Sequence, residues 1–486
     1  MLKIVTAQLK VQPGHPSENT ENMLTMIAQA KDQGADLIIF PEMAVPGYLL
    51  GDTWEQYAFL QDCEECGQDI IKASQDIAII FGNVAVDWEK KNYDGRVRKY
   101  NALFTAWQGK LVQPRNMPYP YVIKTLMPNY REFDDTRYFF GLKQLAEEMG
   151  TEAAKLIGTV PLTIKGQNYN IGGFLCEDGW SEDYNLAPVE VLTRQGVDML
   201  VNISASPYTL GKNGKRHRVF GKQAKAAGVP LFYVNNVGIQ NNGKTVYTFD
   251  GSSTLYNGQG LMVDCLPKYQ QGMGIYELDK IQTMPKFQRE KQPDIAHIFA
   301  AIEYAVKEFL ADIHMDKVVI GISGGIDSAV AAALYTHILG PEKVLLVNMP
   351  SVYNSATTKG LAQELAVNLG CNYTIMPIQE SVDHTIDQLE HIPVTFLKDG
   401  SKFNLQVSSF VAENIQARDR SARVLAGAAA AFGGGFTCNA NKAETTVGYS
   451  TLYGDQSGFL CALADLWKHQ VYDLARYMNQ VVYGRE

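Results

Sequence analysis

The feature that most constrains the fold of this chain is a repeated switch between strand-length apolar runs and helical apolar spacing. Strand-length runs occur at residues 36–40, 78–81, 171–175, 199–203 and 231–234. After the first strand-like segment, apolar side chains recur at helical spacing at Met23, Met26, Ile27 and Ala30. Because buried strands separated by amphipathic helices pack into layers, the pattern predicts an α/β architecture.

A polar, proline-flanked stretch divides the chain after residue 280. Residues 281–293 read IQTMPKFQREKQP and keep neither period, so we predict a linker there between domains at residues 1–280 and 294–486. Beyond the linker, an apolar helix face leads into a strand at residues 318–322, and strand and helix patterns alternate to residue 377. This series predicts a second domain with a doubly wound, Rossmann-like sheet.

Composition excludes several classes of protein. The 486 residues carry a formal net charge of −9, which disfavours nucleic acid and anionic membrane surfaces as partners. No run is apolar enough to span a bilayer, and the N-terminus lacks the pattern of a signal peptide. The seven cysteines are scattered and odd in number, which favours a reducing cytoplasm. Cys63 and Cys66 form a lone C-x-x-C, which we interpret as two cysteines on one helix face rather than as a zinc or redox site.

Three reactive side chains follow predicted strands of the first domain. Glu42, Lys124 and Cys176 stand just past strand ends, where sites gather in α/β folds. Together they can hydrolyse an amide, because a thiolate attacks the carbonyl, a carboxylate moves the proton and an ammonium stabilises the oxyanion. Taken singly, each has an ordinary structural role. A Cys–His pair is the rival device, but His15 and His217, the only histidines before residue 290, lie in no local signature.

The sequence around these three residues resembles the nitrilase (carbon–nitrogen hydrolase) superfamily. FPEMAVPGY (40–48), KTLMPNYREF (124–133) and GGFLCEDGW (172–180) are similar, in order, to its Glu, Lys and Cys motifs. MPNYREFDDTRYF (127–139) and NISASPYTLGK (202–212) resemble its glutamine-hydrolysing branch. The resemblance implies an αββα sandwich, and it implies that Tyr130, Ser206 and Lys212 hold the substrate glutamine.

A glycine turn opens the predicted second domain. The strand at residues 318–322 runs into SGGIDS (323–328) and then into an alanine-rich helix. Backbone N–H groups at such a turn and helix N-terminus bind phosphate, and Ser323 and Ser328 add hydroxyl donors. The absence of a lysine excludes the ordinary G-x-x-x-x-G-K-[ST] loop. Asp327 repels phosphate unless a cation lies between them, so we predict Mg²⁺.

SGGIDS resembles the pyrophosphate loop of the ATP pyrophosphatase family, whose members activate a substrate by adenylation. Further segments resemble the NAD synthetases of that family: NMPSVYNS (348–355), VAENIQARDR (411–420), NANKAE (439–444), GYSTLYGD (448–455) and LADLWKHQVYDLARYMN (463–479). The resemblance implies these ATP contacts: Gly321, Ile322, Ser323, Gly324, Gly325, Ile326, Asp327, Ser328 and Asn439. It also implies that Asn414 and Glu444 contact the dinucleotide substrate, and that Glu444 joins Asp327 near Mg²⁺.

Together the two halves resemble the glutamine-dependent NAD synthetase family over almost the whole chain. The resemblance implies that the first domain hydrolyses glutamine to glutamate and ammonia. The second domain is then expected to use MgATP to adenylate deamido-NAD (nicotinate adenine dinucleotide), and ammonia displaces AMP to give NAD, with release of pyrophosphate. It also implies a homo-oligomer. Two departures stand out: Asn439 replaces the usual threonine, and Ala440 replaces the usual glycine.

The end of the chain also departs from the family pattern. The family continues past the final helix with a segment that carries a further substrate-binding lysine. We therefore expect the chain ending at Glu486 to synthesise NAD poorly, and its final helix (Leu474, Met478, Val481) to lack a packing partner. A stand-alone amidase, or a nucleotide-binding protein without turnover, also fits the sequence. The intact motifs at Cys176 and Asp327 weigh against both alternatives, while the missing segment weighs for the amidase.

Overall fold

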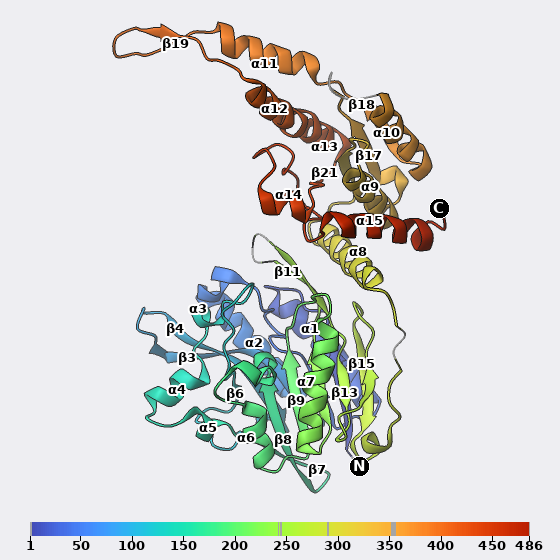
Figure 1. The fold of residues 1–486 in the computed structure, drawn as a ribbon. Helices are drawn as coiled ribbons and strands as arrows, with labels where there is room; N and C mark the ends of the chain where they lie inside the picture. The colour runs from blue at the N-terminus through green and yellow to red at the C-terminus, as the bar shows by residue number, and fades with distance from the viewer. Residues whose placement is uncertain (1, 242, 244, 289–290, 351–355, 486) are drawn as a thin grey trace. The chain divides into compact units, whose positions relative to one another are not determined.

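A computed structural model describes residues 2–241, 243, 245–288, 291–350 and 356–485, with the side chains of residues 356–359 excepted. The chain forms two compact units, Met1–Lys291 and Gln292–Glu486, each of which mixes helices and strands (Figure 1). Residues 351–355 of the NMPSVYNS segment lie outside the described residues. Within the described ranges, no helix has the length and apolar character needed to cross a bilayer.

Two mixed sheets form the centre of the first unit. One has the order β15 (Gly272–Glu277), β1 (Lys3–Gln8), β2 (Leu37–Ile39), β3 (Ala78–Lys91), β4 (Val97–Trp107) and β5 (Lys110–Leu111), with β6 (Val122–Ile123) also paired to β4. The other has the order β14 (Met262–Cys265), β13 (Thr254–Tyr256), β10 (Leu231–Asn235), β9 (Met199–Ser204), β8 (Gln167–Leu175) and β7 (Val160–Ile164). A separate hairpin pairs β11 (Val237–Asn241) with β12 (Val246–Asp250).

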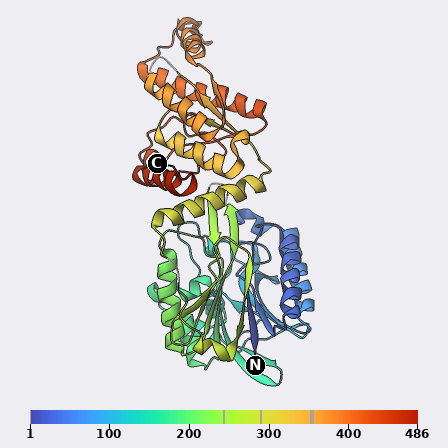
Figure 2. The ribbon, with the colours of Figure 1, turned by 90° about the vertical axis from the view of Figure 1, so that its right-hand side faces the viewer.

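The sheets pack face to face because each presents an apolar inner face. Ile4 and Ile39 of one sheet share a buried cluster with Val201 and Phe232 of the other. Helices α1 (Pro16–Asp32) and α2 (Tyr57–Ala73) cover one outer face, and α4 (Leu142–Glu148), α6 (Pro188–Arg194) and α7 (Lys212–Ala227) cover the other. Figure 2 shows the strands of this unit between the two helical layers. The predicted αββα sandwich is confirmed.

Short elements join these layers. They are the turns and helices η1 (Gly51–Glu55), α3 (Asp135–Tyr138), α5 (Ala153–Leu156), η2 (Cys176–Gly179), η3 (Ser181–Asp183) and η4 (Leu278–Thr283). Cys63 and Cys66 both lie on helix α2, as their spacing predicted, and the structure shows that both are buried. Helix α7 ends at Gly228, whose φ of 70° is the left-handed cap that glycine adopts without steric cost.

A parallel sheet organises the second unit. Its order is β18 (Asn372–Ile375), β17 (Val344–Asn348), β16 (Val318–Gly321) and β21 (Gly435–Phe436). One face carries Ile320 and Leu346 and packs against α8 (Asp294–Asp312), α9 (Ile326–Leu339), α10 (Ala356–Leu369) and α15 (Lys468–Tyr477). The opposite face carries Val319 and Val347 and packs against η6 (Asp419–Leu425) and α13 (Ala426–Phe432). Helices on both faces confirm the predicted doubly wound sheet.

The final helix differs from its expected state. Leu474 and Met478 are fully buried, because α8 and α9 supply the apolar surface against which α15 packs. Only Val481, in the π-helical turn η7 (Met478–Val482), keeps most of its side chain exposed. The prediction that these residues lack a packing partner is therefore wrong for two of the three.

An extended arm projects from the second unit. It consists of α11 (Gln379–His391), the hairpin β19 (Val394–Thr395) and β20 (Lys402–Phe403), and α12 (Ser409–Arg418), with the hairpin at its tip (Figure 1). Large apolar side chains on this arm are exposed, among them Phe396, Leu397 and Phe403. A cavity lies between α12 of the arm and helix α14 (Lys442–Val447), beside the SGGIDS turn.

Candidate active sites

Cys176 lies at the turn that follows strand β8. The strand ends at Leu175, and Cys176 begins the single-turn helix η2 with φ of 32°. A positive φ is uncommon for a residue with a Cβ and is held only where the surrounding structure enforces it. The thiol is buried, and this conformation places it at the carboxyl edge of the sheet.

Glu42 and Lys124 follow strands β2 and β6 of the other sheet and form a buried ion pair. Lys124 Nζ lies 2.9 Å from Glu42 Oε1 and 2.7 Å from Asp135 Oδ2, and all three side chains are almost fully buried. Glu42 also accepts hydrogen bonds from Asn101 Nδ2 at 2.7 Å and from the backbone N–H of Ala205 at 2.8 Å. These contacts hold the carboxylate and the ammonium in one geometry.

The protonation states in this cluster suit amide hydrolysis. Burial lowers the pKa of Lys124, but the carboxylates of Asp135 and Glu42 outweigh it and hold this pKa well above its ordinary value. Burial, with the nearby Glu42 carboxylate, raises the pKa of Cys176 to about 12. The resting site therefore holds an ammonium and a neutral thiol, so a base must take the thiol proton when the sulfur attacks.

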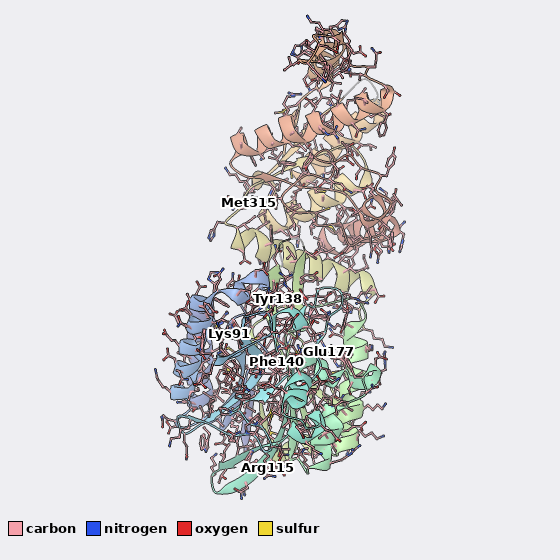
Figure 3. All side chains as sticks on the ribbon, turned by 90° about the vertical axis from the view of Figure 1, so that its left-hand side faces the viewer. Lys91, Arg115, Tyr138, Phe140, Glu177 and Met315 are labelled. Atoms are coloured by element: carbon pink, nitrogen blue, oxygen red, sulfur yellow. The ribbon has the colours of Figure 1, made fainter. Side chains whose placement is uncertain are left out.

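The three residues expected to hold glutamine lie on separate segments of this unit. The Tyr130 hydroxyl donates to Glu177, which directly follows Cys176 and is labelled in Figure 3. Ser206 is buried, and its backbone N–H donates to Asn235 Oδ1 at 2.9 Å. Lys212 begins α7, and its Nζ donates to the backbone carbonyl of Pro207 at 3.0 Å. Burial, and then the charge of Arg216, lowers the pKa of Lys212 to about 8.

The SGGIDS segment forms a closed turn between β16 and α9. Gly324 has φ of 83°, which favours glycine, and Gly325 caps the helix. The Ser328 hydroxyl donates to the carbonyl of Gly325 at 3.0 Å and accepts from the N–H of Ser323 at 3.3 Å. Helix α9 has 14 residues, so its N-terminus presents the positive end of an extended dipole to this turn.

A cavity of about 750 Å³ opens beside this turn. Its wall includes most of the residues predicted to bind nucleotide: Gly321, Ile322, Ser323, Asp327, Ser328, Asn414, Asn439 and Glu444. Gly324, Gly325 and Ile326 form the turn itself. The side-chain amide of Asn439 donates to the carbonyl of Gly321 at 3.2 Å and accepts from the Thr437 hydroxyl at 2.9 Å. A volume of this size accommodates a nucleotide-sized ligand.

Asp327 has two partners in this cavity that its motif does not reveal. One carboxylate oxygen accepts from Asn441 Nδ2 at 3.0 Å, and the other pairs with Lys468 Nζ. Asn441 also caps α14, and its backbone N–H donates to Glu444 Oε2 at 3.2 Å. Asn441 therefore links the two carboxylates predicted to lie near Mg²⁺.

The carboxylates of this cavity are hard oxygen ligands, which Mg²⁺ prefers. Within the described residues, no group of three His, Cys, Asp or Glu side chains has the arrangement of a metal site. Because one oxygen of Asp327 already faces Lys468, the donor set fits a Mg²⁺ that arrives bound to phosphate rather than one held by protein alone.

The sequence motifs do not single out several residues of the two sites. In the first unit these are Tyr48, Asn101, Asp135 and Asp178, and in the second unit Asn441 and Lys468. The Tyr48 hydroxyl donates to Asp135, and its ring centroid lies 5.1 Å from Lys124 Nζ. All of them except Asn101 lie inside the motif segments. A charged or polar side chain near a recognised motif residue is therefore a sequence signal that could have identified them.

The two units of the chain match two different protein families. Residues 3–286 match the carbon-nitrogen hydrolase family, and residues 298–483 match the NAD synthase family. A glutamine-dependent NAD(+) synthetase of Synechocystis is 34% identical over 99% of this chain and 81% of its own length. That of Acinetobacter baylyi is 30% identical over 98% and 79%. The solved structure of glutamine-dependent NAD+ synthetase from Acinetobacter baumannii with ADP superposes with a TM-score of 0.81, at 28% identity, over 99% of this chain and 82% of that one.

The two sites and two folds define a carbon–nitrogen hydrolase joined to an ATP-dependent synthase, a ligase that takes its nitrogen from an amide. Over more than nine tenths of its length, the chain aligns with curated enzymes of one kind. It belongs to the family of glutamine-dependent NAD synthetases.

Proposed function

We propose that Glu42, Lys124 and Cys176 hydrolyse glutamine, and that the SGGIDS turn and its cavity bind MgATP and deamido-NAD. The observation that carries the first half is the buried Lys124–Glu42 pair at 2.9 Å, next to a thiol whose pKa both charges influence. In the proposed mechanism, Glu42 takes the Cys176 proton as sulfur attacks the carboxamide carbon. The Lys124 ammonium stabilises the oxyanion, and Glu42 returns the proton to the departing ammonia. Water then releases glutamate from the thioester.

Glu42→Gln tests the proton transfer. The amide keeps the shape of the carboxylate and the acceptor for the Ala205 N–H, but it cannot accept the thiol proton. We expect the rate of glutamine hydrolysis to fall by roughly 10²–10⁴-fold, the usual contribution of a general base. Synthesis from added ammonium should stay within about twofold of wild type in a paired assay. Glutaminase activity that survives the change would assign the proton transfer to another group.

We place the substrate glutamine against Tyr130, Ser206 and Lys212. A pKa of about 8 for Lys212 makes this testable by pH. Below that pKa the side chain is an ammonium that can hold the carboxylate of glutamine. As pH rises through about 8 the charge is lost, so the KM for glutamine should rise, towards a limiting slope of about tenfold per pH unit.

Lys212→Arg is the matched control for this pH dependence. Its guanidinium stays charged over the whole range, so its KM should stay flat to a higher pH. The ammonium group of glutamine itself titrates identically with both proteins. Identical pH profiles for the lysine and arginine proteins would remove Lys212 from the carboxylate-binding role.

On the synthetase side, the proposed ATP contacts are residues 321–328 and Asn439, with Asn414 and Glu444 on the deamido-NAD side. Support comes from the cavity that all of these residues except Gly324, Gly325 and Ile326 line. We propose that Asp327 and Glu444 hold the Mg²⁺ of MgATP, where a cation neutralises the departing pyrophosphate. Asn439 contributes by tying the loop after β21 to the end of β16 through the carbonyl of Gly321. Measuring glutamine hydrolysis with and without ATP and deamido-NAD tests the complete assignment.

Three further assignments remain proposals. We place the domain boundary in residues 281–293, with domains at 1–280 and 294–486. We place the protein in the cytoplasm. The free thiols of all seven cysteines, each among the described residues, support this location.

We propose a homo-oligomer. The exposed Phe396, Leu397 and Phe403 of the arm are the surface that we assign to self-association. Size-exclusion chromatography with light scattering of wild type and Leu397→Asp tests that assignment.

A further inference from the structure

Asp178 is a buried carboxylate that the hydrolytic mechanism does not use. It lies in η2, two residues after Cys176, and only 1% of its surface is exposed. Its Oδ1 accepts the backbone N–H of Leu126 at 2.7 Å and that of Thr125 at 3.1 Å. Its Oδ2 accepts the backbone N–H of Leu175 at 3.3 Å.

The three donors belong to the two segments that carry the reacting groups. Thr125 and Leu126 directly follow Lys124, and Leu175 directly precedes Cys176. A single carboxylate therefore spans from the lysine segment to the cysteine turn. Because Cys176 has a positive φ, the turn needs such external contacts to keep its shape.

The geometry points to Asp178 as a positioning residue for glutamine hydrolysis, which fixes Lys124 and Cys176 relative to each other through backbone hydrogen bonds. This inference rests on the proposed roles of Lys124 and Cys176. Asp178 itself touches no reacting atom in this scheme. Its contribution is to hold the oxyanion-stabilising ammonium at a constant distance from the sulfur, where a displacement of about 1 Å costs roughly a hundredfold in rate.

The burial of Asp178 and its neighbouring groups set the charge state of its carboxyl group. Burial raises the pKa of Asp178 to about 7, against the opposing effect of its N–H donors and Lys124. Lys124 is one titratable group near Asp178, and Tyr184 is another, since the Asp178 charge raises the pKa of Tyr184. The neighbouring Glu177 instead accepts hydrogen bonds from the Tyr130 and Tyr184 hydroxyls. On its other side lies a small apolar cavity that includes Leu142, Phe174 and Leu192.

The sign of the pH effect follows from this pKa. Above about pH 7, Asp178 is a carboxylate, and both oxygens accept N–H donors. Below it, one oxygen carries a proton and turns from acceptor to donor, so it opposes a backbone N–H. Glutaminase turnover should therefore fall as pH falls through about 7, while ammonium-driven synthesis should show no such step from this group.

Asp178→Asn is the direct test. The amide keeps the oxygen that accepts from Thr125 and Leu126 but presents an NH₂ group to Leu175. We expect the kcat for glutamine hydrolysis to fall roughly tenfold to a hundredfold, with KM within about threefold and ammonium-driven synthesis unchanged. The step near pH 7 should disappear from its rate profile.

Asp36→Asn serves as the matched control. Asp36 is also buried and also accepts a backbone N–H, that of Lys3 at 3.0 Å, but it precedes β2, whereas Glu42 follows that strand. We expect Asp36→Asn to keep the kcat for glutamine within about twofold. An equal loss in both variants would overturn the inference, because it would report general destabilisation.

Unchanged glutaminase kcat in Asp178→Asn also overturns the inference. If Cys176→Ala is inactive in the same assay, the proposed function survives that result. If Cys176→Ala is active as well, the proposed function fails with it. Should Asp178→Asn not fold, the profile of the unaltered protein decides: a fall in kcat centred near pH 7 supports the inference, and a flat profile between about pH 6 and 8 contradicts it.

Discussion

We expect Cys176→Ala to make no NAD from glutamine and to make it from added ammonium at close to the wild-type rate. The sulfur is required only to liberate ammonia, whereas the nucleotide cavity is built from residues of the second unit. Loss of a catalytic nucleophile removes roughly 10⁴-fold or more of turnover, so no rate from glutamine should be measurable. A paired assay with each nitrogen donor provides the comparison.

Cys265→Ala is the control for this experiment. Cys265 is a partly buried thiol of the same unit, on β14 rather than at the turn after β8. Its loss should leave both nitrogen donors usable. An equal loss of both activities in Cys176→Ala would instead show that the substitution damages the whole protein, and would remove the support for a nucleophilic role.

The second large effect is expected from Asp327→Asn, which should abolish synthesis with either nitrogen donor. The change removes one negative charge from the cavity where MgATP is proposed to bind, and it leaves the Lys468 ammonium facing a neutral amide. Metal-assisted stabilisation of the departing pyrophosphate is worth several kcal/mol, so a loss of roughly a hundredfold or more is expected. Glutamine hydrolysis should survive in part, because its site lies in the other unit.

Asp316→Asn is the matched control for Asp327. Both carboxylates pair with a lysine, but Asp316 precedes strand β16 and its partner Lys343 lies 3.6 Å away, whereas Asp327 follows that strand. The Asp316 side chain is also exposed, so its loss should change synthesis little. NAD formation from ammonium at near the wild-type rate by Asp327→Asn would contradict the proposed metal role.

Much of the fold could be predicted from period and turn chemistry. The strand-length runs at residues 171–175 and 199–203 became β8 and β9, and the SGGIDS turn joins β16 to α9. These predictions succeed because local apolar spacing and glycine placement decide local structure. The final helix was misjudged for a physical reason: whether Leu474 is buried depends on α8 and α9, which lie more than a hundred residues earlier in the chain.

The recognised site residues were predictable for a similar reason, and their partners were not. Glu42, Lys124 and Cys176 could be recognised because each follows a strand, and functional groups of α/β folds gather just past strand ends. The partner of Asp327, however, is 141 residues further along the chain at Lys468, and no local pattern encodes such a pair. Asp135 and Asp178 are also acidic residues in motif segments, but their burial and their donors appear only in three dimensions.

We propose that this one chain transfers the amide nitrogen of glutamine to deamido-NAD. The most direct measurement supplies glutamine labelled with ¹⁵N in the amide, together with MgATP and deamido-NAD, and follows the products by mass spectrometry. We expect NAD that carries one ¹⁵N, formed with equal amounts of AMP and pyrophosphate. Hydrolysis of glutamine with no labelled NAD, at saturating concentrations of all substrates, would contradict it and would identify the chain as an amidase alone.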